Sequence, residues 1–389
     1  MNLAERFKQS EGYIIQMRRL FHSQPELSLH EEHTQSLIRE QLSQMGIPCQ
    51  ELAPSFGLAG MICGSRPGRT IALRADIDAL PVTEETGLPF QSQNPGVMHA
   101  CGHDAHIAML LGAARVLNQV KEELAGRVVL LFQAAEETGH GTQEALEYFD
   151  SIGGIDQIIG LHIWSEFEEG EILLLPGSVM AGGHGIAFHI KGMGGHGSRP
   201  DLVRDPIKAA CDLVLKLSSI PSSYYNVLDH CAVSIGQFES GTAGNIIPGE
   251  ARLKGTARYF KKDGAEAVNA IIRRFCQGTA ACHGVEIEFS PTGSLAPVYN
   301  SPKAIELARS LVPSVEGLRL RAQQDPLSGS DNMGVLLDKY PGFYGILGGR
   351  NQAAGCSYPQ HSSRFNIDEK ALPKGAQFMA AYAVRYLNS

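Results

Sequence analysis

Residues 127–163 read RVVLLFQAAEETGHGTQEALEYFDSIGGIDQIIGLHI, and this stretch decides the fold. Two apolar runs, Arg127–Gln133 and Gln157–Ile163, have the length and composition of buried strands. The segment between them has room for a short helix. A helix between two buried strands is typical of a parallel pair, because parallel strands need a crossover connection. The stretch therefore predicts a mainly parallel sheet with helices on both faces.

The same alternation continues on both sides of this stretch. Strands are predicted at Leu58–Cys63 and Thr70–Ala75, and a helical pattern covers His103–Leu124. After residue 183 the predicted order becomes strand, helix, strand, strand, helix, strand, which is the ferredoxin-like βαββαβ arrangement. We therefore predict an α/β catalytic domain, residues 1–182 and 293–389, interrupted by an α+β lid or dimerisation domain, residues 183–292.

Composition excludes several classes of protein. The 389 residues are 43% hydrophobic and 19% charged, enough apolar material for a sizeable core. The net charge of −8 leaves no basic footprint for nucleic acid, and the chain has no apolar run of about 18 residues that could span a bilayer. The N-terminal segment lacks signal-peptide features, and the eight cysteines form no C-x-x-C pair. We expect a cytoplasmic protein in a reducing compartment.

The segment MHACGHDAH, residues 98–106, is the densest cluster of metal-capable side chains. Cys101 and His103 are two residues apart, and alternate residues of an extended segment point the same way. Thiolate and imidazole suit borderline-soft divalent metals. A buried cysteine beside a capping histidine explains the same residues equally well.

The segment QAAEET, residues 133–138, places Glu136 and Glu137 directly after an apolar strand. Buried carboxylates at a strand end carry a desolvation cost that a cation would remove. One carboxylate could then bind metal while the other carries protons. The simpler alternative is an acidic turn that begins the next helix.

Two histidines become candidate metal ligands because of their predicted positions. His162 ends the strand QIIGLHI, and His361 lies in the loop YPQHSSRFNIDE. Taken singly, the first could be a core histidine and the second a surface histidine. Cys101, Glu136, Glu137 and His162 are all predicted just after strands, at the carboxyl edge where open α/β sheets bind ligands. Five convergent ligands would suffice for two metal ions.

The sequence resembles the metal-dependent amidohydrolases related to aminoacylase and glutamate carboxypeptidase. It is most similar to the branch that holds hippurate hydrolases, N-acyl-amino-acid deacylases and auxin-conjugate hydrolases. The motifs that carry the resemblance span almost the whole chain: RRLFHSQPELSLHE, IALRADIDALPV, MHACGHDAH, AAEE, GLH, GMGGHGSRP, NIIP, GTARYF and HSSRF. A cysteine ligand in ACGHDAH distinguishes this branch from relatives that use other ligands.

The resemblance implies a role for each residue that matches a motif. The implied ligands of two divalent metal ions, zinc, manganese or cobalt, are Cys101, His103, Glu137, His162 and His361. Glu136 matches the general base, and Asp76 matches an outer carboxylate that orients a ligand, although loop capping explains Asp76 equally well. His196 matches a stabiliser of the oxyanion, in its own subunit or across a dimer. Asn245 and Arg258 match residues that hold the substrate carboxylate.

The resemblance therefore implies an enzyme that hydrolyses the amide bond of N-acyl amino acids. One alternative is a dipeptidase or carboxypeptidase on the same scaffold, and another is a catalytically silent scaffold protein. We expect a small-molecule substrate, no nucleic-acid or membrane partner, and a homodimer or higher homo-oligomer.

Overall fold

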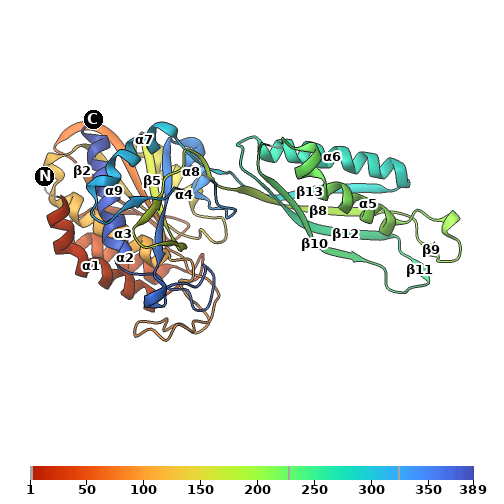
Figure 1. Ribbon diagram of the computed structural model, residues 1–389, viewed down its shortest axis with the longest axis horizontal. Coiled ribbons are helices and arrows are strands. Elements are labelled where there is room, and N and C mark those ends of the chain that lie inside the picture. The colour runs from red at the N-terminus through yellow and green to blue at the C-terminus, as the bar shows by residue number, and fades with distance from the viewer. Residues whose placement is uncertain (1–2, 227, 323–324) are drawn as a thin grey trace. The chain divides into compact units, whose positions relative to one another are not determined.

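The computed structural model describes residues 3–226, 228–322 and 325–389. The chain divides into two compact units, and each has its own sheet (Figure 1). Unit 1 comprises Met1–Val179, Tyr299–Asp325 and Val335–Ser389, and unit 2 comprises Met180–Val298 and Pro326–Gly334. In the described part of the chain, no helix has both the length and the apolar character needed to cross a membrane.

Unit 1 is built on an eight-stranded sheet in the order β1-β2-β4-β3-β5-β16-β6-β15. Its central strands β4, β3, β5 and β16 are parallel neighbours, and β1 and β2 form an antiparallel edge. The bounds are β1 (Cys49–Leu52), β2 (Gly57–Cys63), β3 (Arg66–Asp76), β4 (Ala125–Gln133), β5 (Gln157–Glu168), β6 (Glu171–Leu173), β15 (Arg319–Leu320) and β16 (Gly342–Arg350). The central strands are almost continuously buried, as expected for a parallel sheet covered on both faces.

The connections place helices on opposite faces of this sheet. The chain runs from β3 to β4 through α3, and then back past β3 to β5 through α4. Right-handed crossovers in opposite directions put their helices on opposite faces. The helices of unit 1 are α1 (Leu3–Ser23), α2 (Glu32–Gln44), α3 (His103–Gln119), α4 (Thr142–Ser151), α7 (Pro302–Leu311) and α9 (Ala371–Leu387), and α8 (Met333–Lys339) begins where the two units meet in sequence.

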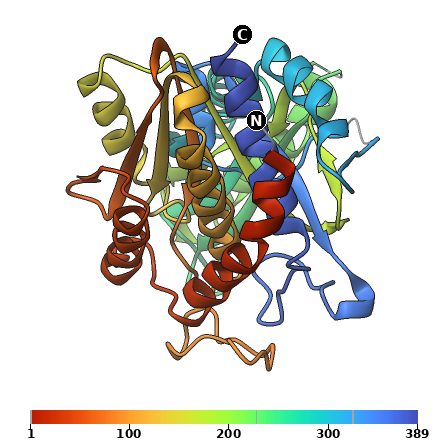
Figure 2. The same cartoon turned by 90° about the vertical axis from the view of Figure 1, so that its left-hand side faces the viewer.

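Helices α1, α3 and α9 pack against one another, side by side in Figure 2. Gly112 of α3 makes this close approach possible, because a Cβ there would lie 2.6 Å from the Ile14 side chain of α1. Helix α3 ends at Gln119, five residues before the end of its apolar pattern, and a 3₁₀ turn at Lys121–Glu123 leads into β4. The short strands β6, β7 (Gly177–Met180), β14 (Val298–Asn300) and β15 were not expected from the sequence.

Unit 2 has a four-stranded antiparallel sheet in the order β10-β12-β8-β13. Its elements follow one another as β8 (Gly182–Lys191), α5 (Pro206–Ser218), β10 (Cys231–Ser240), β12 (Glu250–Tyr259), α6 (Gly264–His283) and β13 (Glu286–Leu295). The two helices contact each other and the sheet, and they enclose a separate apolar core. This order and topology are those of the ferredoxin-like sandwich. A two-stranded ribbon, β9 (Gly195–His196) with β11 (Ile246–Ile247), extends it.

Candidate metal centre

The carboxyl ends of the central strands of unit 1 bring polar residues together. Strand β3 ends at Asp76 and β4 at Gln133, and the chain leaves β3 in one direction and β4 in the other. Ligand sites of open α/β sheets lie at such a reversal of strand order.

Three overlapping groups of donor atoms lie at this edge. Within each group the potential ligand atoms are all within 4.8 Å of one another. The groups are Cys101, His103 and His162; Cys101, Glu137 and His361; and His103, Glu136 and Glu137. All six residues singled out for this centre are therefore brought together, and Cys101 belongs to two groups. A fourth group, Asp76 with His103 and His106, was not anticipated.

Hydrogen bonds turn the same nitrogen of two histidines toward the centre. His103 Nδ1 lies 2.9 Å from the carbonyl oxygen and 3.1 Å from Oδ1 of Asp78, so it carries the proton that it donates. His162 Nδ1 lies 2.7 Å from the carbonyl oxygen of Ile163 and donates there. In both rings Nε2 is left as the basic nitrogen, the form in which histidine binds metal.

Two buried atoms of the centre lack hydrogen-bond partners. His103 Nε2 and Glu137 Oε1 are 3.8 Å apart, and neither has a hydrogen-bond partner among the described residues. Unsatisfied buried polar atoms are costly, and a cation between a basic nitrogen and a carboxylate oxygen would satisfy both. The sulfur, nitrogen and oxygen donors of the centre suit zinc and neighbouring divalent ions. The residues therefore fit a metal centre.

Burial determines the protonation of these groups. Burial raises the pKa of the Cys101 thiol well above its usual range and also raises the pKa of Glu137. Burial lowers the pKa of His162. Burial disfavours charge on His103 too, but the Asp76 carboxylate and the interactions with Cys101 and Asp78 together outweigh burial and raise the pKa of His103. Without a cation the Cys101 thiol keeps its proton, so a cation that bound this sulfur would release a proton.

Two aspartates behind the centre have different partners. Asp78 accepts hydrogen bonds from His103 and, at 3.0 Å, from the backbone N–H of Glu137, so it holds members of two donor groups. Asp76 accepts from His106 Nδ1, while His106 Nε2 accepts from the Ile163 N–H at 2.9 Å. Asp76 therefore reaches the neighbourhood of His162 through His106, and its nearest oxygen is 3.8 Å from His103 Nε2.

The backbone at the centre differs from the sequence expectation in two places. Cys101 and His103 do not lie on an extended segment, because Gly102 between them has φ of 93° and His103 begins α3. A Cβ at Gly102 would lie 2.4 Å from Cγ2 of Ile163, so only glycine fits this left-handed turn. His162 lies inside β5 rather than at its end, since β16 keeps pairing with β5 as far as Glu168.

Two non-glycine residues of the centre also have left-handed backbones. Ala135, directly before Glu136, has φ of 57°, and His361 has φ of 66°. Such conformations are uncommon and persist where surrounding contacts impose them. The N–H of His361 donates to the carbonyl of Ala100 at 2.8 Å, and the N–H of Ala135 donates to Oε1 of the buried Glu31 at 2.8 Å. Glu31 and His106 were not singled out from the sequence.

The three remaining predicted residues lie in unit 2. His196 pairs with Ile246 in the β9–β11 ribbon, next to the exposed Asn245, whose carbonyl accepts from Gly197 N at 2.9 Å. Arg258 is half-buried and pairs in register with Gly183, at the opposite end of β12 and β8. His196 and Asn245 are thus close together, and Arg258 is distant from both.

Comparisons with known proteins identify the same kind of family as the motifs of the sequence. The model of peptidase family M20/M25/M40 matches residues 72–385. Thermostable carboxypeptidase 1 of Saccharolobus solfataricus is 36% identical over 395 residues, with 100% of both chains covered. N-acetylcysteine deacetylase of Bacillus subtilis is also 36% identical, with 97% of each chain covered.

Solved structures agree as well. A dinuclear metal-binding peptidase of the M20 family from Bacillus subtilis superimposes with a TM-score of 0.85 and 34% identity, over 98% of this chain and 99% of that chain. The predicted fold class and the family resemblance are both confirmed. Because the family model covers most of the chain and full-length relatives exceed 30% identity, the chain belongs to peptidase family M20/M25/M40.

Proposed function

We propose that this hydrolase uses two divalent metal ions to cleave the amide bond of N-acyl amino acids. The observation that carries the proposal is the convergence of one thiol, three imidazoles and two carboxylates in overlapping donor groups. The ligands would be Cys101, His103, Glu137, His162 and His361. Cys101 would be shared, because it is common to the group with His103 and His162 and the group with Glu137 and His361. Zinc, manganese and cobalt all suit this set of donors.

Glu136 has the position of a proton carrier in this reaction. It is half-buried, and its carboxylate lies within 4.8 Å of the donor atoms of His103 and Glu137. Bound divalent cations would make the attacking water more acidic and polarise the amide carbonyl. Glu136 accepts the proton that the water loses and delivers it to the leaving amine nitrogen.

The charge of the centre favours an anionic substrate. Two divalent cations contribute +4, whereas the Cys101 thiolate and the Glu137 carboxylate contribute −2. The centre keeps a net charge of +1 after the Glu136 carboxylate is added, and a hydroxide brings the sum to zero. It therefore attracts the carboxylate of an N-acyl amino acid before the attacking water loses its proton.

The positions of residues within unit 2 support a homodimer. Arg258 and Glu250 are eight residues apart on β12, which is about 26 Å at 3.3 Å per residue. The ribbon with His196 and Asn245 continues beyond the Glu250 end. One small substrate cannot touch both His196 and Arg258 of the same chain. We therefore propose that residues 183–292 form a lid and dimerisation domain, and that one of these residues serves the partner subunit.

Mixing two inactive variants tests this arrangement. His196→Ala and Arg258→Ala should each lose activity, and co-refolded mixtures should regain up to about a quarter of the normal rate through heterodimers with one intact site. Mixtures that stay inactive although heterodimers form would contradict the shared site.

A second candidate function is supported by the relative named carboxypeptidase. The two activities differ in whether the substrate has a free α-amino group, so a panel of N-acetyl and N-benzoyl amino acids beside the matching dipeptides distinguishes them. We expect amine release from the acylated substrates, loss of release after EDTA, and recovery with zinc, manganese or cobalt.

Glu136→Gln separates metal binding from catalysis. The variant should bind metal normally and lose at least about 100-fold in rate, because the proton carrier is gone. A variant with undiminished rate would favour a different base. The eight free cysteines are consistent with a cytoplasmic enzyme, which we include in the proposal.

A further inference from the structure

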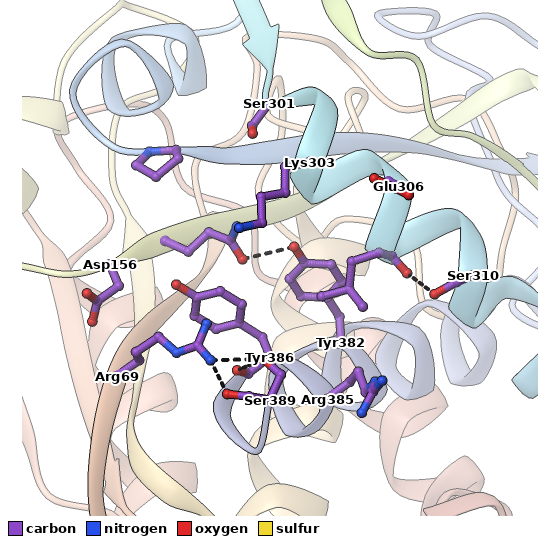
Figure 3. Close-up of a pocket in the computed structure, with 13 residues that line it drawn as sticks. Arg69, Asp156, Ser301, Lys303, Glu306, Ser310, Tyr382, Arg385, Tyr386 and Ser389 are labelled. Atoms are coloured by element: carbon purple, nitrogen blue, oxygen red, sulfur yellow. Dashed lines mark hydrogen bonds between the residues drawn. The ribbon is translucent and has the colours of Figure 1, made fainter.

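A pocket lies in unit 1 at the amino ends of the parallel strands (Figure 3). It has a volume of about 650 Å³ and lies between α7, the end of α9 and the starts of β5 and β16. We call it the amino-edge pocket; the residues that matter for its chemistry are Gln157, Lys303, Glu306, Leu307, Arg385 and Tyr386. His162 lies five residues beyond Gln157 on β5, about 16 Å along the strand. The pocket is therefore separate from the metal centre, and its volume suits a small molecule.

The floor of the pocket contains an unused hydrogen-bond donor. Gln157 is 7% exposed, and its Oε1 accepts from the hydroxyl of the fully buried Tyr382 at 2.9 Å. No described residue accepts a hydrogen bond from Nε2 of Gln157. Because Gln157 lines the pocket and its Nε2 has no protein acceptor, an acceptor atom of a ligand can take the place of solvent on this donor. The floor therefore favours a ligand with a hydrogen-bond acceptor.

The rim of the pocket contains charges of both signs. Lys303 comes from α7 and Arg385 from α9, as Figure 3 shows, and neither has an ion-pair partner among the described residues. Glu306, one turn after Lys303, likewise has no described partner. Arg69 and Asp156 are already engaged, the first with Ser389 and the ring of Tyr386, the second with the Thr70 N–H at 2.7 Å. Donors for an anion and an acceptor for a cation are thus both available.

We propose that the amino-edge pocket binds a free α-amino acid with an apolar side chain. The ligand carboxylate accepts from Gln157 Nε2 and from Lys303, and the ligand ammonium donates to Glu306. The apolar side chain lies against Leu307 and the ring of Tyr386. The proposal does not rest on the proposed function, because it uses none of the residues of the metal centre.

Calorimetry with the metal-loaded full chain tests the proposal with three probes of similar shape. L-phenylalanine has both charges, 3-phenylpropionate lacks the ammonium, and 2-phenylethylamine lacks the carboxylate. We expect phenylalanine to bind about 3- to 5-fold more tightly than either analogue, the range for one exposed ion pair. The fluorescence of Trp164, whose ring is 5.4 Å from that of His162, reports binding at the metal centre separately.

Variants locate the bound amino acid. Lys303→Ala should weaken phenylalanine binding about 3- to 5-fold, and Lys8→Ala, an exposed helical lysine elsewhere in unit 1, should leave it unchanged. Gln157→Glu keeps the oxygen that accepts from Tyr382 but removes the amide donor, so it should weaken binding at least about 10-fold. Absence of phenylalanine binding, equal affinity for 3-phenylpropionate, or equal effects of Lys303→Ala and Lys8→Ala would each overturn the proposal.

Discussion

Replacement of Glu31 by glutamine should change how the stability of unit 1 depends on pH. Glu31 is fully buried, its Oε1 accepts from the Ala135 N–H at 2.8 Å, and its Oε2 has no hydrogen-bond partner within the described part of the chain. Burial, with a contribution from the Asp78 charge, raises the pKa of Glu31 to about 7. The unfolded chain has the ordinary glutamate pKa near 4.5.

The sign and size of the effect follow from this difference. The folded state binds the Glu31 proton more tightly than the unfolded state does, so this contribution to stability is complete below about pH 4.5 and is lost as pH rises through 7. A shift of this size corresponds to about 3 kcal/mol at 1.36 kcal/mol per pKa unit. From pH 5 to pH 8 the native chain should therefore lose roughly 2–3 kcal/mol of unfolding free energy relative to the Glu31→Gln variant.

Urea unfolding at four pH values from 5 to 8 measures this difference. Any pH-independent destabilisation caused by the new amide group drops out of this comparison, because only the change of the unfolding free energy with pH is used. Glu32→Gln, at the exposed neighbouring position, is the matched control and should differ from the native chain by a constant amount. If the free energies of unfolding of Glu31→Gln and the native chain also differ by the same amount at every pH, the assignment of a buried, proton-binding carboxyl is refuted.

Three further predictions concern the surroundings of the centre. Elemental analysis of Gly102→Ala should find that most of the bound metal is lost, because the left-handed backbone and the close contact with Ile163 leave no room for a side chain. Full metal content in this variant would contradict the prediction. Arg18→Met removes one of the two cationic partners of the buried Asp104, the other being His22, and should cost about 3–5 kcal/mol in chemical unfolding. Arg19→Met, at an exposed ion pair, should cost at most about 1 kcal/mol, and equal costs of the two variants would refute the distinction. Peptide mapping by mass spectrometry should find Cys101 protected from alkylation by zinc while exposed Cys63 reacts equally with and without it; equal labelling of Cys101 in both states would count against a metal ligand.

Much of the architecture could be predicted because the period and length of apolar runs in the sequence indicate where helices and buried strands form. The runs at Arg127–Gln133 and Gln157–Ile163 became central parallel strands, and the β-α-β-β-α-β order of unit 2 was also found. The short strands β6 and β15 escaped prediction because two or three residues carry no detectable period and are defined by their neighbours in the sheet.

The donors of the centre and one outer carboxylate, Asp76, were predicted from motifs, but the other residues that support the centre were not. Glu31 is about a hundred residues from Ala135 in sequence, and only the folded chain brings its carboxylate to that backbone N–H. His106 follows His103 by three residues, yet its partners, Asp76 and the Ile163 N–H, come from two different strands. Contacts of this kind depend on tertiary structure, which residue types and spacing within one segment do not encode.

The exposure of His361 has a consequence for how the enzyme would exchange its metal ions. Its side chain is 55% exposed and comes from a loop, whereas the side chain of Glu137 is 12% exposed and that of His103 is 1% exposed. A chelator in solution therefore meets the ion beside His361 first. Gradual removal of metal should pass through a species that retains one ion, so activity plotted against bound metal would bend at half occupancy instead of following a straight line.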